Sequence, residues 1–340
     1  MRRLRAAATL LLLVLGAAAG AWVYYLSTPA GRGGAPRVVE IPPGRPLAAV
    51  ARDLEAAGVI RHRRLFTLYA WSVGAAGRLK AGEYELAANL TPRQVLGRLL
   101  RGEVLQHRIT IPEGSSVREI AALLAAAGLA DEHAVLAKAE DPQFARALGV
   151  PADRLEGYLA PDTYYFARGI PPEAILRAMV ARYRAMVTPA LLEEAARQGL
   201  TEHRLVTLAS IVEKETGRPE ERPLVAAVFR NRLARGIPLQ SDPTVIYGLE
   251  RFDGNLRRAD LLRWSPYNTY RIVGLPPGPI ASPGLAAIEA TLRPAPVDYL
   301  YFVSRNDGTH HFSRTLAEHE RAVDRYQRRP ARRGAPRAAR

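Results

Sequence analysis

The 340-residue sequence has no cysteine, which excludes disulfide bonds and thiolate metal sites. None of its seven histidines stands in an H-E-x-x-H or similar ligand spacing, so we expect no metal and no other cofactor. His310 and His311 fall in a predicted hairpin, where neighbouring side chains point to opposite faces. That argues against a metal site shared by these two residues and His319. No basic-aromatic RNA-binding pattern accompanies the net charge of +15, so nucleic acid is not an expected partner.

Acidic residues are missing from the end of the chain. Residues 328–340 carry six Arg and no Asp or Glu, which predicts a disordered basic tail over 326–340. Part of the positive charge therefore says little about a folded basic face. For this tail we favour a solvated chain end over contact with anionic lipid or another polyanion.

Charge is also missing from a long stretch near the N-terminus. No charged residue lies between Arg5 and Arg32, and the apolar run 6–26 has about the 20 residues that a helix needs to cross a bilayer. The small residues in "GAAAGA" (16–21) would also suit a cleaved signal peptide. The length of the run favours a retained anchor. So do the aromatic residues at its end, Trp22, Tyr24 and Tyr25, because such residues form a belt at membrane interfaces.

Positive charge precedes the apolar run, at Arg2, Arg3 and Arg5. By the positive-inside rule the N-terminus is then cytoplasmic. We therefore expect a single-pass protein of the cytoplasmic (inner) membrane. Residues 1–27 would be the cytoplasmic stub and anchor, 28–37 a Gly/Pro linker, and the rest of the chain would be exported.

A repeat follows the linker. Residues 38–60 align with residues 108–130 at an offset of 70 residues, and the copies share an I-P-x-G element and an Ala-Gly pair. Each copy predicts a short β-branched strand, a turn, and a helix that ends at a Gly. Two copies are too few for a solenoid, which usually needs at least about three repeats. They indicate one module that was duplicated and then diverged.

The first copy continues into a small α+β unit over 38–105. A second helical stretch (61–77) and a strand (79–87) follow its first helix, which gives the order strand, helix, helix, strand. This order resembles a LysM-type module, a class that binds glycan chains. An equal alternative is a packing module that holds the next domain at a fixed distance from the membrane.

The remainder, 106–325, is predicted to be mainly helical. Loops rich in Pro, Gly, Tyr and Asn separate the helices, and the last of these loops, 298–315, has the alternation of a β-hairpin around Asn306, Asp307 and Gly308. The predicted helices cover 131–147, 171–186, 189–198, 202–216, 222–235 and 284–292.

Four carboxylates follow an apolar helical run in "LASIVEKETGRPEERPLVAAVF" (208–229): Glu213, Glu215, Glu220 and Glu221. Residues three and four apart share a helix face, so Glu215 extends the bulkier apolar row and Glu213 a row of smaller residues. Gly217 and Pro219 end the helix and place Glu215 in its last turn. Glu220 and Glu221 are expected to serve the first turn of the next helix.

The helix dipole and the apolar neighbours both disfavour the ionised form of Glu215. A carboxyl group with a raised pKa near a cleft is what a general acid acting on a glycosidic oxygen requires. A carboxylate that ends an apolar row is more often simply exposed. Glu215 is therefore the candidate catalytic residue with only a modest lead, and Glu213 is the runner-up.

The loops supply polar partners for a polyhydroxylated substrate. Amides, hydroxyls and Tyr rings on Pro/Gly-shaped loops suit a sugar-binding cleft, although each residue alone is also ordinary turn chemistry. Glu156 and Tyr158, in "LEGYLAPDTYYF" (155–166), are assigned to the same predicted site. The other candidates come from two loops: Gln240, Ser241, Asp242, Thr244 and Tyr247, then Tyr267, Asn268, Thr269 and Tyr270.

Seven stretches carry a more specific signal because of their order: "TIPEG" (110–114), "LEGYLAPDTY" (155–164), "LASIVEKET" (208–216), "VFRNRLARGIPLQSDPTVIYG" (228–248), "YNTY" (267–270), "GLPPGPIASPG" (274–284) and "YLYFVSRNDGTHHFSRTLAEH" (299–319). Together they resemble the membrane-anchored endolytic murein transglycosylases, the MltG or YceG-like family. The resemblance runs from the anchor to about residue 325.

The resemblance implies an α+β fold with an N-terminal transmembrane helix, a small LysM-like module and a mixed, mainly helical catalytic domain with β-hairpins over 106–325. It implies cleavage of the MurNAc-GlcNAc bond inside peptidoglycan strands, with closure of a 1,6-anhydro ring by one carboxyl group that acts first as acid and then as base. The essential Glu of the family lies in the E-K-E-T element, where the second Glu corresponds to Glu215.

Two other functions stay open. One is a muramidase hydrolase with a second carboxylate, Asp242 or Glu213. The other is a membrane-tethered glycan-binding scaffold without catalysis. The expected partners are peptidoglycan strands, the membrane and peptidoglycan synthases.

Overall fold

The computed structural model describes residues 2–328. The predicted basic tail, 326–340, lies outside the described residues from position 329 onward. The chain forms two compact units. The first runs to Arg108 and takes in a return segment, Tyr165–Gly169; the second holds Ile109–Tyr164 and the described residues from Ile170.

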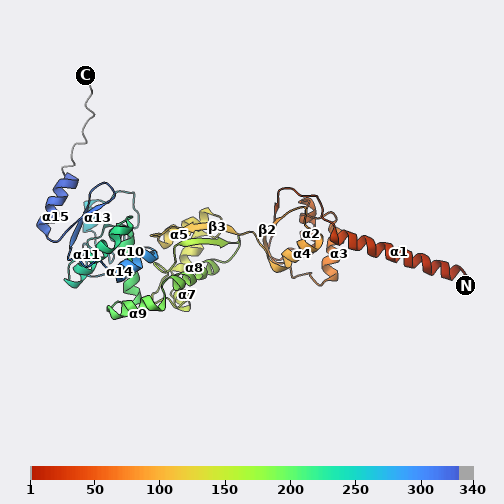
Figure 1. The fold of residues 1–340 in the computed structure, drawn as a ribbon, viewed down its shortest axis with the longest axis horizontal. Coiled ribbons are helices and arrows are strands. Elements are labelled where there is room, and N and C mark those ends of the chain that lie inside the picture. The colour runs from red at the N-terminus through yellow and green to blue at the C-terminus, as the bar shows by residue number, and fades with distance from the viewer. Residues whose placement is uncertain (1, 329–340) are drawn as a thin grey trace, which may run out of the picture. The chain divides into compact units, whose positions relative to one another are not determined.

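The first unit begins with helix α1, Arg2–Ser27 (Figure 1). It is long and apolar enough to cross a membrane, and a signal sequence would meet the same test. Its side chains are exposed along most of their length, and only Tyr25 and Leu26, near its end, are buried. Its exposed apolar surface suits a segment that lipid covers, which is true of a membrane span and of a signal sequence alike.

The rest of this unit is a two-stranded sheet with three helices. Strand β1, Arg37–Ile41, pairs antiparallel with β2, Gly82–Leu86, so that Val39 lies opposite Tyr84. The predicted order of strand, helix, helix, strand is what the structure has. The helices α2, Leu47–Ala56, α3, Arg63–Ser72, and α4, Pro92–Arg101, enclose a core that includes Leu54, Phe66, Tyr84, Leu96 and Leu99.

The second copy of the repeat folds like the first. Strand β3, His107–Ile111, leads into helix α5, Val117–Ala126, as β1 leads into α2. Gly44 and Gly114 take positive φ angles of 73° and 75° in the turn between strand and helix, a conformation that favours glycine. The strands differ in their partners, because β3 pairs with β4, Asp162–Phe166, whereas β1 pairs with β2.

Most predicted helices of the second unit are confirmed within about one residue at each end. They are α8, Pro172–Met186, α9, Pro189–Arg197, α10, Glu202–Glu215, α11, Arg222–Ala234, and α14, Leu285–Leu292. The single helix predicted over 131–147 is wrong. It is two helices, α6, Glu132–Ala139, and α7, Pro142–Ala147, because the Asp141 side chain accepts hydrogen bonds from the first amides of α7 and Pro142 occupies its first turn.

Three short helices lie in segments predicted as loop or left unassigned: α12, Asp242–Tyr247, α13, Arg258–Leu262, and α15, Leu316–Val323. The predicted hairpin is present as β5, Tyr301–Ser304, and β6, His310–Ser313. Asn306 and Gly308 take positive φ angles of 63° and 84° in its turn. Short non-α turns follow α10, Pro219–Glu221, and end the described chain, Asp324–Arg328.

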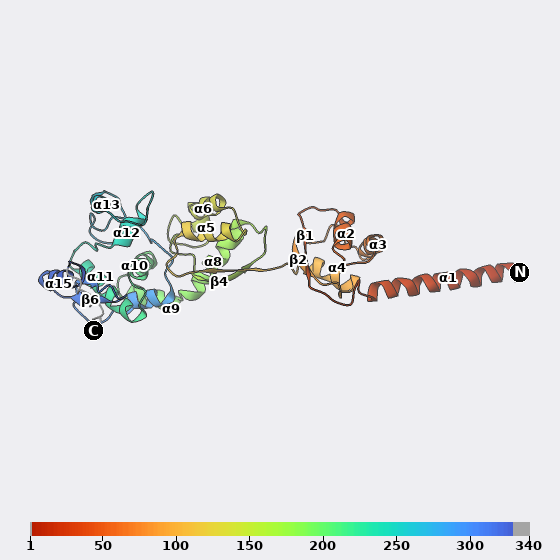
Figure 2. The same ribbon diagram turned by 90° about the horizontal axis from the view of Figure 1, so that it is seen from above.

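Helix α10 lies inside the second unit, packed against α11 and α14 (Figure 1, Figure 2). Its Leu208, Ile211 and Val212 are fully buried against Val225 and Phe229 of α11. A helix held on both sides in this way gives a rigid support to whatever group stands at its end.

Candidate active site

Glu215 is the last residue of α10. The helix starts where the Thr201 side chain accepts a hydrogen bond from the Arg204 amide, and it ends because Thr216 turns to extended backbone. The Glu215 carboxyl group lies at a pocket of about 430 Å³. The polar and charged side chains that line it with Glu215 include Arg232, Gln240, Asp242, Tyr270, His310 and His319.

Burial raises the pKa of Glu215 to about 7, and the neighbouring negative charge of Asp242 acts in the same direction. The Ser241 hydroxyl donates a hydrogen bond to the carboxyl group, and this bond opposes the shift, as does the charge of Arg232. A carboxyl group in this state holds its proton up to neutral pH and is then able to give it to a bound oxygen.

Glu213, two residues earlier on α10, is held by structural contacts. Its Oε1 accepts a hydrogen bond from Arg222 Nη2 at 2.9 Å, and its Oε2 accepts one from the Gly284 amide at 2.9 Å. The side chain is only 5 % exposed. Both oxygens are therefore occupied in tying α10 to α11 and to the start of α14, and Glu213 is not among the residues that line the Glu215 pocket.

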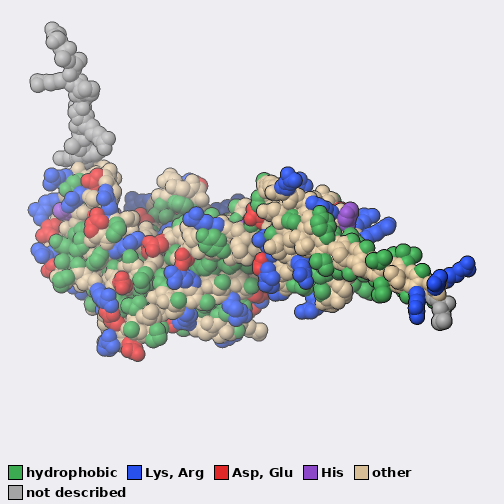
Figure 3. All heavy atoms as spheres, turned by 45° about the vertical axis from the view of Figure 1, so that its right-hand side comes forward, with side chains coloured by type: hydrophobic (Ala, Val, Ile, Leu, Met, Phe, Trp, Pro, Cys, Tyr) green, Lys and Arg blue, Asp and Glu red, His purple; other side chains and the backbone are tan. Residues whose placement is uncertain are grey.

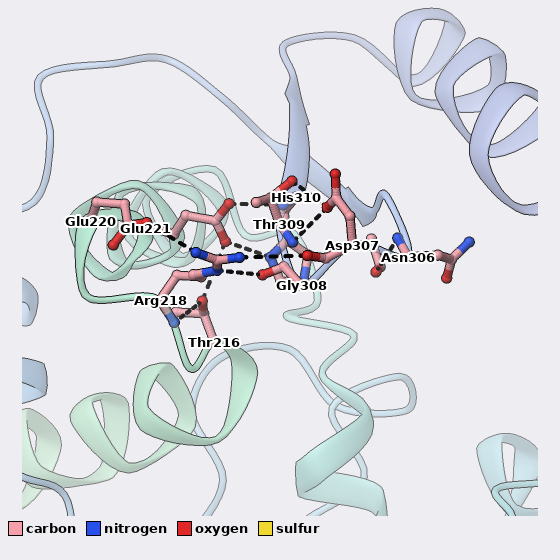
Figure 4. Close-up of polar contacts among 10 residues, drawn as sticks. Thr216, Arg218, Glu220, Glu221, Asn306, Asp307, Gly308, Thr309 and His310 are labelled. Atoms are coloured by element: carbon pink, nitrogen blue, oxygen red, sulfur yellow. Dashed lines mark hydrogen bonds and ion pairs between the residues drawn. The ribbon is translucent and has the colours of Figure 1, made fainter.

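Glu221 lies in the turn before α11, but its carboxylate reaches the hairpin and does not serve the first turn of the helix as we expected (Figure 4). Its Oε1 accepts the His310 amide at 2.8 Å, and its Oε2 lies 2.7 Å from His310 Nδ1. Burial works against ionisation, yet the His310 hydrogen bonds hold the pKa of Glu221 below its usual value. The ionised carboxylate fixes Nδ1 as the protonated ring nitrogen.

The segment after Glu215 is thus fastened to the turn of the hairpin. The Thr216 hydroxyl lies 3.3 Å from Glu221 Oε2 and accepts the Arg218 amide at 3.0 Å. Arg218 Nε donates to the Gly308 carbonyl oxygen at 3.2 Å (Figure 4). These contacts bring His310 to the wall of the Glu215 pocket from a part of the chain about 95 positions later.

Arg232 fixes the other wall of the pocket. This side chain is 7 % exposed, and it donates to the carbonyl oxygens of Leu300 at 2.6 Å and Leu239 at 2.9 Å and to Gln240 Oε1 at 3.1 Å. Gln240 has a positive φ of 56°, a strained conformation for a residue other than glycine. The guanidinium therefore helps to hold the backbone on which Gln240, Ser241 and Asp242 follow one another.

Of the predicted substrate-binding residues, Gln240, Asp242 and Tyr270 line this pocket, and Ser241 contacts Glu215. Tyr270 donates a hydrogen bond to Asp242 Oδ1 at 2.7 Å. Polar side chains that already bond to one another at a pocket wall are preorganised for a polar ligand.

Three other candidates from the same loops are buried beneath them. The Thr244 and Thr269 hydroxyls lie 2.8 Å apart, and Thr269 Oγ1 accepts the Ser241 amide at 2.9 Å. Asn268 is 1 % exposed and donates to the Arg263 carbonyl oxygen at 2.6 Å. These side chains shape the loops that carry Ser241 and Tyr270.

Glu156, Tyr247 and Tyr267 meet at a different pocket, of about 200 Å³. Glu156 accepts hydrogen bonds from the Val117 amide at 3.1 Å and from the Tyr247 hydroxyl at 3.0 Å, and burial raises its pKa to about 7. Tyr158 is fully buried, with its hydroxyl 2.9 Å from His203 Nδ1. The predicted site residues therefore divide between the Glu215 pocket, a second pocket and the interior.

Arg232 and the two histidines of the Glu215 pocket were missed as site residues in the sequence. His310 and His319 were weighed only as metal ligands, and no group of three or more His, Cys, Asp or Glu side chains able to hold a metal occurs among residues 2–328. The available signal was their position inside the ordered stretches, "VFRNRLARGIPLQSDPTVIYG" and "YLYFVSRNDGTHHFSRTLAEH".

The fold and the pocket together define an α+β protein that presents one protonatable carboxyl group, at the end of a buried helix, to a cleft lined with polar loops. The chain belongs to the YceG-like family, whose model matches residues 39–325. It is similar to the endolytic murein transglycosylase of Bacillus subtilis (strain 168), with 34 % identity over 304 residues, covering 85 % of this chain and 84 % of that protein.

Two further relatives agree with this assignment. The endolytic murein transglycosylase of Streptococcus pneumoniae serotype 2 is 34 % identical over 317 residues, which cover 84 % of this chain and 57 % of that protein. The crystal structure of a putative YceG-like protein from Listeria monocytogenes matches with a TM-score of 0.59 and 33 % identity, over 84 % of this chain and 99 % of that one.

Proposed function

We propose that this protein is an endolytic lytic transglycosylase of peptidoglycan, with Glu215 as its catalytic acid and base. The observation that carries the proposal is the state of Glu215, a largely buried carboxyl group at a polar pocket with a pKa raised to about 7. The names of the relatives supply the substrate class, since these proteins are called endolytic murein transglycosylases.

The reaction needs one proton donor and no added water. The carboxyl group of Glu215 gives its proton to the oxygen that leaves with GlcNAc, and the bond from that oxygen to C1 of MurNAc breaks. The ionised Glu215 then takes the proton of the MurNAc 6-hydroxyl while this oxygen bonds to C1, which closes the 1,6-anhydro ring. The residue ends the cycle protonated, as it began.

The neighbours of Glu215 suit both halves of this cycle. Ser241 donates to the ionised form and so keeps the pKa from rising further, and Asp242 favours the protonated form. Gln240 and Tyr270 offer an amide and a hydroxyl to sugar oxygens. A group that must be acid and then base works best with a pKa near the working pH.

We further propose that α1 is a retained anchor in the cytoplasmic membrane, with both units of the chain on its outer side. The length and apolar character of α1 and the Arg residues before it support this placement. An enzyme at that surface meets newly made glycan strands, so peptidoglycan synthases are the expected protein partners. The LysM-like nature of the first unit remains a prediction.

The test is product analysis by mass spectrometry on purified glycan strands with uncrosslinked peptides. The native protein is expected to release internal fragments with 1,6-anhydro-MurNAc ends, and the Glu215→Gln variant to release none. The matched control is Glu220→Gln, because Glu220 is an exposed Glu five positions away (67 % side-chain exposure) and is expected to leave activity intact.

A hydrolase is the second candidate, because Asp242 lines the same pocket as Glu215 and would provide the second carboxylate. Its products would carry reducing MurNAc ends and one oxygen atom from water. Reaction in ¹⁸O-labelled water separates the two functions. Incorporation of the label would refute the transglycosylase mechanism.

A further inference from the structure

The small unit has a cavity of about 760 Å³ between α2 and α3 that the proposed reaction does not use. Three basic side chains line it, those of Arg52, Arg63 and Arg64, together with the apolar side chains of Leu68 and Trp71. Large apolar side chains in a basic surround are unusual on a free surface and indicate a contact with something.

The apolar part of this lining belongs to one face of α3. Arg64, Leu68 and Trp71 are spaced four and three residues apart, so they follow one another along the helix surface. Leu68 is 58 % exposed and Trp71 70 % exposed, whereas Phe66 and Ala70 on the inner face are fully buried. A helix that shows Trp, Leu and Arg on its outer face has the composition of helices that lie in a membrane interface.

Contacts with α1 place α3 at the height of that interface. The rings of Trp22 and Tyr69 lie 6.5 Å apart, and the Tyr25 hydroxyl donates to the His62 carbonyl oxygen at 3.1 Å. If Arg5 marks the inner boundary, about 20 residues of helix at 1.5 Å each cross the hydrocarbon core of about 30 Å and bring Trp22 and Tyr25 to the outer boundary.

Trp71 then lies close to the depth of Trp22 and Tyr25, at the outer boundary of the hydrocarbon core. It follows Tyr69 by two residues, which is only about 3 Å along the axis of α3. A tryptophan at this depth lies where its ring is most stable, between headgroups and acyl chains.

The charge of the unit also suits a lipid surface. Residues 28–108 hold thirteen Lys or Arg and six Asp or Glu. Figure 3 shows Lys and Arg side chains on this unit beside the end of α1 that joins it. Arg63 pairs with Glu55 at 3.7 Å, whereas no salt bridge to Arg52 or Arg64 is present in the described part of the chain. Both guanidinium groups are thus free to meet phosphate.

We propose that the α2–α3 face, defined by Arg52, Arg64, Leu68 and Trp71, docks on the headgroups of anionic phospholipids in the outer leaflet. Leu68 and Trp71 enter the boundary between headgroups and acyl chains, and the two Arg contact lipid phosphates. The protein then has a second attachment beside its anchor, which fixes the orientation of the small unit on the bilayer. This inference rests on the proposed anchoring of α1.

The test uses the full chain in lipid nanodiscs that contain either neutral lipid alone or neutral lipid with phosphatidylglycerol. Trp22→Phe and Trp264→Phe leave Trp71 as the only tryptophan, and a nitroxide on the lipid headgroup reports its proximity through quenching. We expect strong quenching with phosphatidylglycerol and weaker quenching in neutral lipid or at high salt. The double replacement Arg52→Gln and Arg64→Gln should reduce the quenching of Trp71 in phosphatidylglycerol nanodiscs to less than half.

The matched control keeps Trp264, an equally exposed tryptophan of the second unit (72 %), in place of Trp71. Quenching of Trp71 no stronger than that of Trp264, or unaffected by the Arg replacements, would overturn the proposal. Loss of Trp71 quenching on addition of glycan strands would also overturn the proposal, since the α2–α3 face would then bind glycan.

Cleavage of glycan strands is measured in the same nanodiscs. Cleavage without Trp71 quenching would refute the docking alone, and quenching without cleavage would refute the proposed enzyme function alone.

Discussion

The Ser241 hydroxyl donates a hydrogen bond to the carboxyl group of Glu215, which joins the loop after α11 to the last residue of α10. This contact connects the "EKET" end of the helix with the "QSDP" loop. It also opposes the effect of burial, because it stabilises the ionised carboxylate.

Ser241→Ala is therefore expected to raise the pKa of Glu215. Glu215 must be protonated to begin the reaction, so the fall of kcat/KM on the alkaline side should move to higher pH, by about one unit for the loss of a hydrogen bond to a charged group. The measurement is the pH profile of strand cleavage. Ser304→Ala, in the same pocket but without a contact to Glu215, should leave the profile in place, and an unmoved alkaline limb in Ser241→Ala would contradict the assignment.

Replacement of Glu213 is expected to lower stability, whereas replacement of Glu215 is expected to abolish activity. Glu213→Gln removes the charged partner that lies 2.9 Å from the Arg222 guanidinium and leaves it only the longer pair with Glu113 at 3.4 Å. The replacement should lower the free energy of unfolding by about 2 kcal/mol, the loss of a hydrogen bond between charged groups. Glu215→Gln removes a carboxyl group that is already disfavoured in its charged form, so the melting temperature should not fall, while activity is lost. Calorimetry of both variants checks this, and the reverse pattern would make Glu213 the better catalytic candidate.

Local patterns in the sequence were enough for the helix end that carries Glu215. The apolar rows along 202–216, with Gly217 and Pro219 after them, predicted where α10 stops, and it stops at Glu215. The same reasoning predicted the repeated strand, turn and helix, because both copies have a Gly where a positive φ is needed. It failed at 131–147, where Asp141 and Pro142 start a new helix that apolar periodicity does not reveal.

Local sequence patterns could not predict which distant residues form the Glu215 pocket. His310 lies in the wall of the Glu215 pocket, and Glu221 and Arg218 fasten the hairpin turn that carries it through contacts between residues about 90 positions apart. Arg232 was not singled out in the sequence, yet the carbonyl oxygens of three other residues receive its hydrogen bonds. Tyr158 and Asn268 were predicted to bind substrate in the cleft and are buried, since side chains that hydrogen-bond inside the protein leave no trace in a local sequence pattern.

The pair of Glu221 and His310 should make stability depend on pH in the acid range. The folded state holds the pKa of Glu221 below its ordinary 4.5, so its contribution is present above pH 4.5 and is lost as the pH falls through the lower folded value. Glu221→Gln should therefore be least stable relative to the native protein near neutral pH, and the two should converge at low pH. Urea unfolding at several pH values tests this, and a constant difference would contradict it.

Glu156 should make stability depend on pH in the opposite direction, with stability falling as the pH rises. Burial raises its pKa from 4.5 to about 7, so between these values the folded protein keeps a proton that the unfolded chain has released, and the stability from this residue declines as the pH rises through that window. Glu156→Gln keeps an oxygen that accepts from the Val117 amide or the Tyr247 hydroxyl but carries no charge. It is expected to match the native protein at pH 5 and to exceed its stability at pH 8. Urea unfolding at both pH values measures the difference, with the exposed Glu220→Gln as control. A variant that is equally destabilised at both pH values would mean that Glu156 is ionised and paired in the folded protein.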